Sequence, residues 1–258
     1  MAATLTAAAC APRPLTLPSG PGAPFADADA AYAEATRGCA GARTLTAELA
    51  LSGRAGRTKL RGRVLAGIER PGAVRLEGVA PFGAPVFIFV AKGGRATLLL
   101  PRDNRVLRDA EPAAVVETLT GVPLEPDALA AALTGCGAPE ADAVSGVIYS
   151  DGRVMITLAS KANVYLDRSA GRWRIVAAVL DPYTVEYPEW TGDRPARVRV
   201  RTKSGATTSA DLSVGLSQVD INTDLDPAAF DVDVPADAAP ITLDELRDAG
   251  PLGRGTDP

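Results

Sequence analysis

Short runs in which polar and apolar residues alternate fill most of this 258-residue sequence from Thr44 onward. Such alternation is typical of β-strands that bury one face, because successive side chains point to opposite sides of a sheet. Gly, Pro, Asp and Asn divide the runs, and Lys92-Gly-Gly-Arg95 and Arg102-Asp-Asn-Arg105 resemble hairpin turns. The pattern therefore predicts two antiparallel meanders. Their strands are expected at Thr44–Gly53, Thr58–Glu69, Val74–Val79, Val86–Ala91, Ala96–Leu100, Arg105–Arg108, Val147–Ser150, Arg153–Ser160, Val164–Arg168, Arg172–Leu180, Thr184–Tyr187, Ala196–Thr202, Ser209–Val214 and Gly215–Asn222.

Helical patterns flank the two meanders and separate them. Residues 27–37 have acidic residues early and a basic residue last, which suits the helix dipole, and Gly38 is expected to end this helix. Pro112–Thr120 and Pro126–Thr134 each begin with proline and are each followed by glycine, which is typical of short helices. A further short helix is expected at Asp244–Arg247.

The length of the chain suits one generous domain or two small ones. No linker-like composition separates the two meanders, so a single long sheet is favoured over two domains. A sheet of this length buries one face by curling, which also shortens its exposed edges. We expect a mainly β (α+β) fold: an unclosed antiparallel β half-barrel of about 11–13 strands with short helices as a lid. This domain is expected over residues 27–240, followed by a short helix and a flexible tail over residues 241–258.

The sequence contains no histidine. This absence excludes Ser-His-Asp and Cys-His nucleophile activation and removes the commonest zinc and iron ligand. The net charge is −4 and aromatic residues make up 5% of the chain, so neither a basic surface block nor a stacking platform indicates a nucleic-acid partner. We therefore expect a protein that is not an enzyme and that carries no cofactor or metal ion.

Two acidic groups deserve comparison with known kinds of site. Asp181, Glu186 and Glu189 lie among aromatic residues, as in some glycan-cleaving clefts, but nothing pairs them at a defined separation, so a solvated strand edge is favoured. The alternating acids between Asp220 and Asp226 resemble a calcium loop, but the glycine and the terminal glutamate of that loop are missing.

Cys10 follows Leu5 and a run of small residues that ends in three alanines. This order resembles a bacterial lipobox, in which the chain is cut before the cysteine and the thiol receives a lipid. We interpret residues 1–9 as a residual signal peptide and residues 10–26, rich in proline, as a lipidated tether. The apolar run is short and has no basic start, so the natural chain is expected to begin upstream. The alternative is a disordered N-terminus with an incidental cysteine.

If Cys10 carries a lipid, Cys39 and Cys136 remain. An even number of remaining cysteines in an exported protein suggests a disulfide. Both residues lie beside glycines at the expected ends of helices, where a mobile backbone helps to meet disulfide geometry. Two buried free thiols are the alternative.

The chain resembles a known family in three segments. These are the strand Leu49-Ala-Leu-Ser-Gly53, the segment Val74-Arg-Leu-Glu-Gly-Val-Ala-Pro-Phe-Gly-Ala-Pro-Val-Phe87, and Ala96-Thr-Leu-Leu-Leu-Pro-Arg-Asp-Asn-Arg-Val-Leu107 leading into Leu119-Thr-Gly-Val-Pro-Leu124. Over residues 43–233 they resemble the bacterial lipoprotein carrier and receptor proteins of the Lol system (LolA/LolB-like). The cysteine pair and the segment Ile241–Leu252 depart from that family.

The resemblance implies an apolar cavity between the sheet and its helical lid. Strand alternation places Phe87, Phe89, Leu98 and Leu100 on one face, and the helices would add Val115, Leu119, Leu129 and Leu133. In receptor-type members an exposed apolar residue in a loop helps to push acyl chains into the membrane, and Phe82 takes that position here. The alternatives are an ordinary filled core and an ordinary turn.

The implied function is that of a monomeric, lipid-anchored protein of the cell envelope, on the periplasmic face of the outer membrane. It would accept acyl chains or lipoproteins in the cavity, and its N-terminal lipid would hold it to the membrane. The alternative is a structural or assembly lipoprotein of the envelope with a filled core and no lipid cargo.

Overall fold

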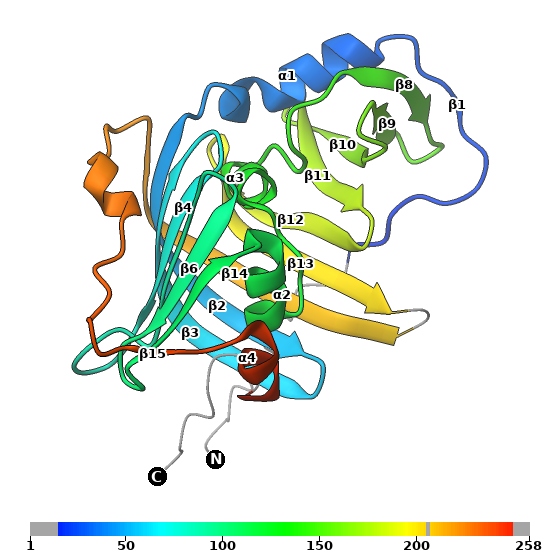
Figure 1. The fold of residues 1–258 in the computed structure, drawn as a ribbon. Coiled ribbons are helices and arrows are strands. Elements are labelled where there is room, and N and C mark those ends of the chain that lie inside the picture. The colour runs from blue at the N-terminus through cyan, green and yellow to red at the C-terminus, as the bar shows by residue number, and fades with distance from the viewer. Residues whose placement is uncertain (1–14, 205–206, 250–258) are drawn as a thin grey trace, which may run out of the picture.

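The computed structural model describes residues 15–204 and 207–249, and these residues build one curved sheet with helices packed in its hollow (Figure 1). Cys10 lies outside this range. The strands are β1 (Ala23–Pro24), β2 (Thr44–Ala55), β3 (Thr58–Glu69), β4 (Ala73–Val79), β5 (Ile88–Lys92), β6 (Arg95–Leu100), β7 (Arg105–Ala110), β8 (Ala143–Ile148), β9 (Val154–Leu158), β10 (Asn163–Ser169), β11 (Arg172–Leu180), β12 (Tyr183–Thr191), β13 (Arg194–Ser204), β14 (Thr207–Ile221) and β15 (Ala239–Pro240). The helices are α1 (Ala28–Ala40), α2 (Pro112–Thr120), α3 (Pro126–Thr134) and α4 (Leu243–Ala249), with a 3-10 turn η1 at Pro227–Phe230.

The fifteen strands found in the described residues follow the order β1-β8-β9-β10-β11-β12-β13-β14-β2-β3-β4-β5-β6-β7-β15. Two antiparallel meanders, β2–β7 and β8–β14, are joined where β14 pairs with β2, for example at Val214 and Leu51. β1 and β15 flank the two outer strands, β8 and β7, which do not pair with each other in the described chain. The predicted unclosed antiparallel half-barrel is confirmed.

Several predicted element boundaries are wrong: β8 was expected at Val147–Ser150 but spans Ala143–Ile148, and β12 runs on to Thr191. β14 is one continuous strand of 15 residues, whereas a boundary was expected at Gly215. Gly215 pairs with Arg197 on one side and Ala50 on the other, so neighbouring strands hold its flexible backbone extended. Helix α1 runs two residues past Gly38, to Ala40.

The inward side chains of the sheet form one continuous core with the buried faces of α2 and α3. Alternation accounts for most of it: Val154, Ile156 and Leu158 in β9 are at most 1% exposed. The outer face of β4 and β5 carries a smaller core, in which Val90 packs with Phe230 of η1. Strand β5 is therefore buried on both faces.

The N-terminal segment is structured before α1. The carbonyl oxygen of Thr16 accepts a hydrogen bond from Arg153 (2.6 Å), β1 pairs with β8, and Phe25 stacks edge-on against Trp173. The last part of the predicted tether thus lies against the domain. No helix in the described part of the chain combines the length and the apolar character needed to cross a membrane.

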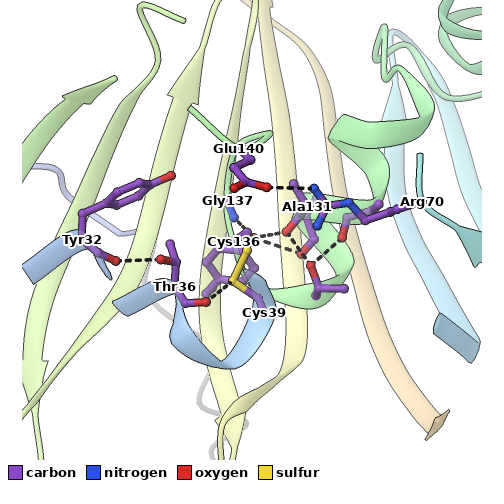
Figure 2. Close-up of a disulfide and its surroundings, with 12 residues drawn as sticks. Tyr32, Thr36, Cys39, Arg70, Ala131, Cys136, Gly137 and Glu140 are labelled. Atoms are coloured by element: carbon purple, nitrogen blue, oxygen red, sulfur yellow. Dashed lines mark hydrogen bonds and ion pairs between the residues drawn. A yellow bond between two sulfur atoms is a disulfide. The ribbon is translucent and has the colours of Figure 1, made fainter. Parts of the chain in front are cut away.

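A disulfide joins Cys39 in the last turn of α1 to Cys136 just after α3, with 5.6 Å between the Cα atoms (Figure 2). Both residues are buried together with Ala131. The predicted cysteine pair is confirmed. The bond fixes the C-terminal end of α3 to the helix that covers the second meander.

Candidate functional site

A cavity of about 100 Å³ lies between the concave face of the sheet and the helices α2 and α3. Its wall is apolar except for Thr120, whose hydroxyl is already used in a 2.7 Å hydrogen bond to the carbonyl oxygen of Val116. Among the described residues no charged side chain lines the wall, which suits an apolar ligand. The lining residues are Leu49, Leu51, Val64, Leu76, Phe87, Phe89, Val116, Leu119, Thr120, Leu124, Leu129, Ala132, Leu133, Val198, Val200, Leu212 and Val214.

The two lid helices are short because their sequences both start and stop them. Each has proline in its first turn, where no N–H partner is lost. Each is followed by a glycine with positive φ, Gly121 at 76° and Gly135 at 95°. At Gly135 the indole ring of Trp190 approaches so closely that a Cβ atom would lie 2.8 Å from it.

The end of α3 is held to the sheet by the hydroxyl group of Tyr187. This oxygen lies 3.0 Å from the carbonyl oxygen of Ala132, to which its O–H donates, and it accepts the N–H of Gly137 at 2.9 Å. Burial raises the pKa of the Tyr187 hydroxyl, so it keeps its proton and remains a donor. Together with the disulfide, this contact fixes α3.

Helix α2 is attached by weaker contacts. The Thr202 hydroxyl donates a 3.2 Å hydrogen bond to the carbonyl oxygen of Gly121, directly after the helix. On its other side α2 packs against α4, whose Leu246 is buried in the same core. The lid thus has one covalently tied helix and one helix held by packing.

Five of the eight residues expected along the cavity do line it: Phe87, Phe89, Leu119, Leu129 and Leu133. The other three, Leu98, Leu100 and Val115, lie in or against the core but outside the cavity wall. Leu98 pairs between Phe89 in β5 and Leu107 in β7 and is completely buried.

Sequence reasoning missed the part of the wall that comes from β2, β3, β4, β13 and β14. Val198 and Val200 alternate with arginines, which marks a buried strand face, but only the pairing of β14 with β2 places them opposite Phe87 and Phe89. The pattern predicts which side chains of a strand point inward. It does not predict which other strand those side chains meet across the core.

Phe82 lies in the loop between β4 and β5 and is 88% exposed, far more than the other large apolar side chains of the described chain. Its carbonyl oxygen accepts a 3.2 Å hydrogen bond from Arg102. The ring therefore projects into solvent from a loop whose backbone is held in place.

Two of the three acidic residues near the aromatic residues of β12 form ion pairs within the protein. Glu186 pairs with Arg201, and Glu189 pairs with Arg197 at 3.1 Å, while Asp181 lies exposed in a turn. In the segment that resembles a calcium loop, Asn222 binds backbone atoms of Arg43 and Gly41, and Asp226 accepts the N–H of Ala228. The described residues contain no group of three or more His, Cys, Asp or Glu side chains able to hold a metal ion.

No protein-family model and no curated protein matches the sequence. The structure is similar to a LolA superfamily protein from Nitrosomonas europaea, with a TM-score of 0.51 at 12% identity over 80% of this chain and 97% of that one. It is also similar, with a TM-score of 0.48 at 11% identity over 76% of this chain and 93% of the other, to a domain from Vibrio parahaemolyticus named for outer membrane lipoprotein sorting. The assignment of the fold rests on the first of these two. The chain therefore has a LolA-like fold.

Proposed function

We propose that this protein is a lipid-anchored binding protein of the bacterial envelope that accepts acyl chains between its sheet and its helical lid. The observation that carries the proposal is the apolar cavity: in the part of the chain that the structure describes, no charged side chain lines it, and the hydroxyl group of Thr120 in its wall is already bonded. A saturated hydrocarbon chain is the ligand class that such a wall favours. The LolA-like fold supports this assignment.

The size of the cavity indicates how an acyl chain would enter. About 100 Å³ holds only a small part of such a chain, whereas ligand pockets usually measure roughly 300–1,000 Å³. Opening therefore requires a lid helix to move away from the sheet. The disulfide and Tyr187 hold α3, so α2 is the helix we propose to move.

Burial of the chain supplies the free energy for this movement. Each methylene group transferred from water gains roughly 0.8 kcal/mol, so about ten methylenes would gain about 8 kcal/mol before the cost of ordering the chain and displacing α2. This gain does not depend on the group attached to the chain. Free fatty acids, phospholipids and lipoproteins therefore all remain within the proposed ligand class.

We further propose that Cys10 carries the lipid anchor and that the protein acts as a monomer on the periplasmic face of the outer membrane, where it receives lipoproteins. The exposed ring of Phe82 would enter the membrane surface during transfer of the chain. The second candidate is a structural envelope lipoprotein with a filled core, and the small volume of the cavity favours that candidate.

Binding of a fluorescent fatty acid such as cis-parinaric acid tests the cavity directly. We expect the full-length protein to bind it, and we expect Ala132→Leu to weaken binding at least tenfold, because the added carbons occupy the cavity. The same change should leave the thermal midpoint unchanged or raise it, since it fills a void.

Ala33→Leu is the matched control, because Ala33 is exposed on α1 and lies away from the cavity. It should bind the probe as the parent does. Absence of binding to the parent protein would favour the filled-core candidate. Equal binding to the parent and to Ala132→Leu would place the ligand elsewhere on the molecule.

A further inference from the structure

The hairpin of β2 and β3 carries an excess of positive charge on a chain whose net charge is −4. Arg54, Arg57, Lys59 and Arg61 are all exposed, and within the described residues none of them forms an ion pair or a side-chain hydrogen bond. Arg54 and Lys59 are direct partners in the ladder, and Arg61 is two residues further along the same outer face of β3. These four residues are called the basic hairpin.

The nearest acidic side chains are already used by other arginines. Asp211 lies opposite Arg54 in the ladder, but both its oxygens accept hydrogen bonds from Arg199, at 2.7 and 2.6 Å. This contact lowers the pKa of the Asp211 carboxyl group, so it stays ionised and paired. Glu48 likewise pairs with Arg63 at 3.2 Å. The charge of the basic hairpin is therefore left for an external partner.

The basic hairpin lies beside the point from which the chain leads to Cys10. Leu15 and Arg54 line the same outer groove of about 720 Å³, together with Arg199 and Asp211. Leu15 is five positions after Cys10, so an extended chain spans at most about 17 Å between them. A lipid on Cys10 would thus keep the basic hairpin close to the surface of its own membrane.

The Phe82 loop lies at the same end of the sheet. The last ladder pair between β3 and β4 joins Arg63 to Val79, and the loop that carries Phe82 follows directly. Residues 58–62 of β3 extend beyond this last pair, so the basic hairpin projects past the end of β4 (Figure 1). The same edge of the molecule therefore carries an exposed aromatic ring and, at the tip of the β2–β3 hairpin, four cations that form no ion pair among the described residues.

We propose that the basic hairpin docks on anionic phospholipid headgroups and so orients the domain with its Phe82 end toward the membrane. The inference rests on the proposed anchoring at Cys10. Basic residues close to an anionic bilayer each strengthen binding about fivefold. Residues 54–63 contain no aromatic side chain on which a base could stack, which favours headgroups over a single-stranded nucleic acid.

Flotation with phospholipid vesicles tests this proposal. The full chain carrying Cys10→Ser, which removes any contribution of the anchor, is mixed with vesicles of phosphatidylcholine alone or with about one third phosphatidylglycerol. We expect binding to the anionic vesicles only, and a steep decrease of binding as salt is raised. Neutralising two charges with Arg57→Gln and Arg61→Gln should weaken that binding about 30-fold.

The matched control is Arg37→Gln with Lys161→Gln. Both residues are exposed, neither forms an ion pair within the described chain, and they lie on α1 and on the turn after β9. This variant has the same net charge as the hairpin variant but leaves the basic hairpin intact. It should therefore retain at least half of the parent's affinity for the anionic vesicles. Equal losses in the two variants would mean that only net charge matters, and the proposal would be overturned.

Two more outcomes would overturn the proposal. One is equal flotation of parent and hairpin variant. The other is that an oligonucleotide displaces the protein from the vesicles at a lower concentration of negative charge than free anionic lipid does. That result would assign the basic hairpin to nucleic acid. No residue of the basic hairpin is among those that line the cavity, so fatty-acid binding in solution should not depend on it. Retention of this binding in the hairpin variant therefore separates a failure of the docking surface from a failure of the acyl-binding proposal.

Discussion

At the scale of single residues, the hydroxyl group of Tyr187 connects the sheet to the lid. It donates to the carbonyl oxygen of Ala132 at 3.0 Å and accepts the N–H of Gly137 at 2.9 Å in a fully buried setting. Tyr187→Phe keeps the ring but removes both of these hydrogen bonds, and the N–H of Gly137 retains only its longer contact with the carbonyl oxygen of Ala131, at 3.2 Å. We expect the free energy of unfolding in urea to decrease by about 1–3 kcal/mol.

Tyr149→Phe is the control for this prediction. Tyr149 is only half-buried, and its hydroxyl contacts the Met155 sulfur atom at 3.7 Å, a weak interaction. Its loss should change the free energy of unfolding by less than about 0.5 kcal/mol. If both variants lost the same free energy, the backbone contacts of Tyr187 would have no special role in holding α3.

The sequence indicated the aromatic and acidic residues of β12 but not their separate tasks. Tyr187 turns inward to α3, whereas Glu186 pairs with Arg201 on the outer face of the sheet. Neighbouring residues on a strand point to opposite faces, so a cluster in the sequence is divided in the structure. Which arginine Glu186 would meet depends on the register of β12 with β13, and no local pattern contains that register.

At the scale of elements, the loop between β4 and β5 places an apolar ring in solvent. Phe82 is 88% exposed, and Arg102 holds the backbone of the loop. We predict that Phe82→Glu decreases the rate of acyl-chain transfer from the protein to vesicles at least fivefold, because a carboxylate resists entry into the membrane surface. Fatty-acid binding in solution should remain unchanged, because Phe82 does not line the cavity.

Val144→Glu is the control for the Phe82 loop. Val144 is also an exposed apolar residue, at 68%, but it lies on β8 in the second meander. The two substitutions add the same charge, so a role for net charge would slow transfer equally in both. Transfer by Phe82→Glu at the rate of the parent would show that the ring does not contact the membrane.

The short helices were predictable and the long strand was not, for the same physical reason. Pro112, Pro126 and the glycines that follow α2 and α3 determine the backbone locally, so the sequence marks both ends of each helix. In β14 the backbone of Gly215 is held by two neighbouring strands, which outweigh its intrinsic flexibility. Two-residue strands such as β1 and β15 depend on tertiary contacts in the same way.

At the scale of the whole molecule, alternation along the chain was sufficient to predict a half-barrel. A single sheet of this many strands with one apolar face buries that face by curling around other elements. The helix pair between the two meanders provides those elements. The volume left under the lid was not predictable. The volume of the cavity depends on small side chains such as Ala132 lying across the core from larger ones such as Phe89. A change of one methylene group in such a side chain would alter this small volume appreciably.

The disulfide makes a prediction for the stability of the whole chain. Cys39 and Cys136 are 97 residues apart, so the bond restricts a large loop in the unfolded state, which is worth about 4–5 kcal/mol in the chain-entropy model. Replacing both cysteines with alanine, in a Cys10→Ser background that prevents mispairing, should lower the free energy of unfolding by about that amount. Urea titration measures this loss.

A reducing agent provides the matching control for the disulfide prediction. It should lower the stability of the parent to that of the double variant and leave the variant unaffected, because the variant has no bond to reduce. The bond acts mainly on the unfolded chain. If Tyr187 and packing are enough to keep α3 in place, the parent and the double variant should bind fatty acid equally below the unfolding transition. Weaker binding by the double variant would instead show that the covalent tie itself positions α3 over the sheet. A parent protein whose stability does not respond to reduction would contradict the predicted contribution of the bond.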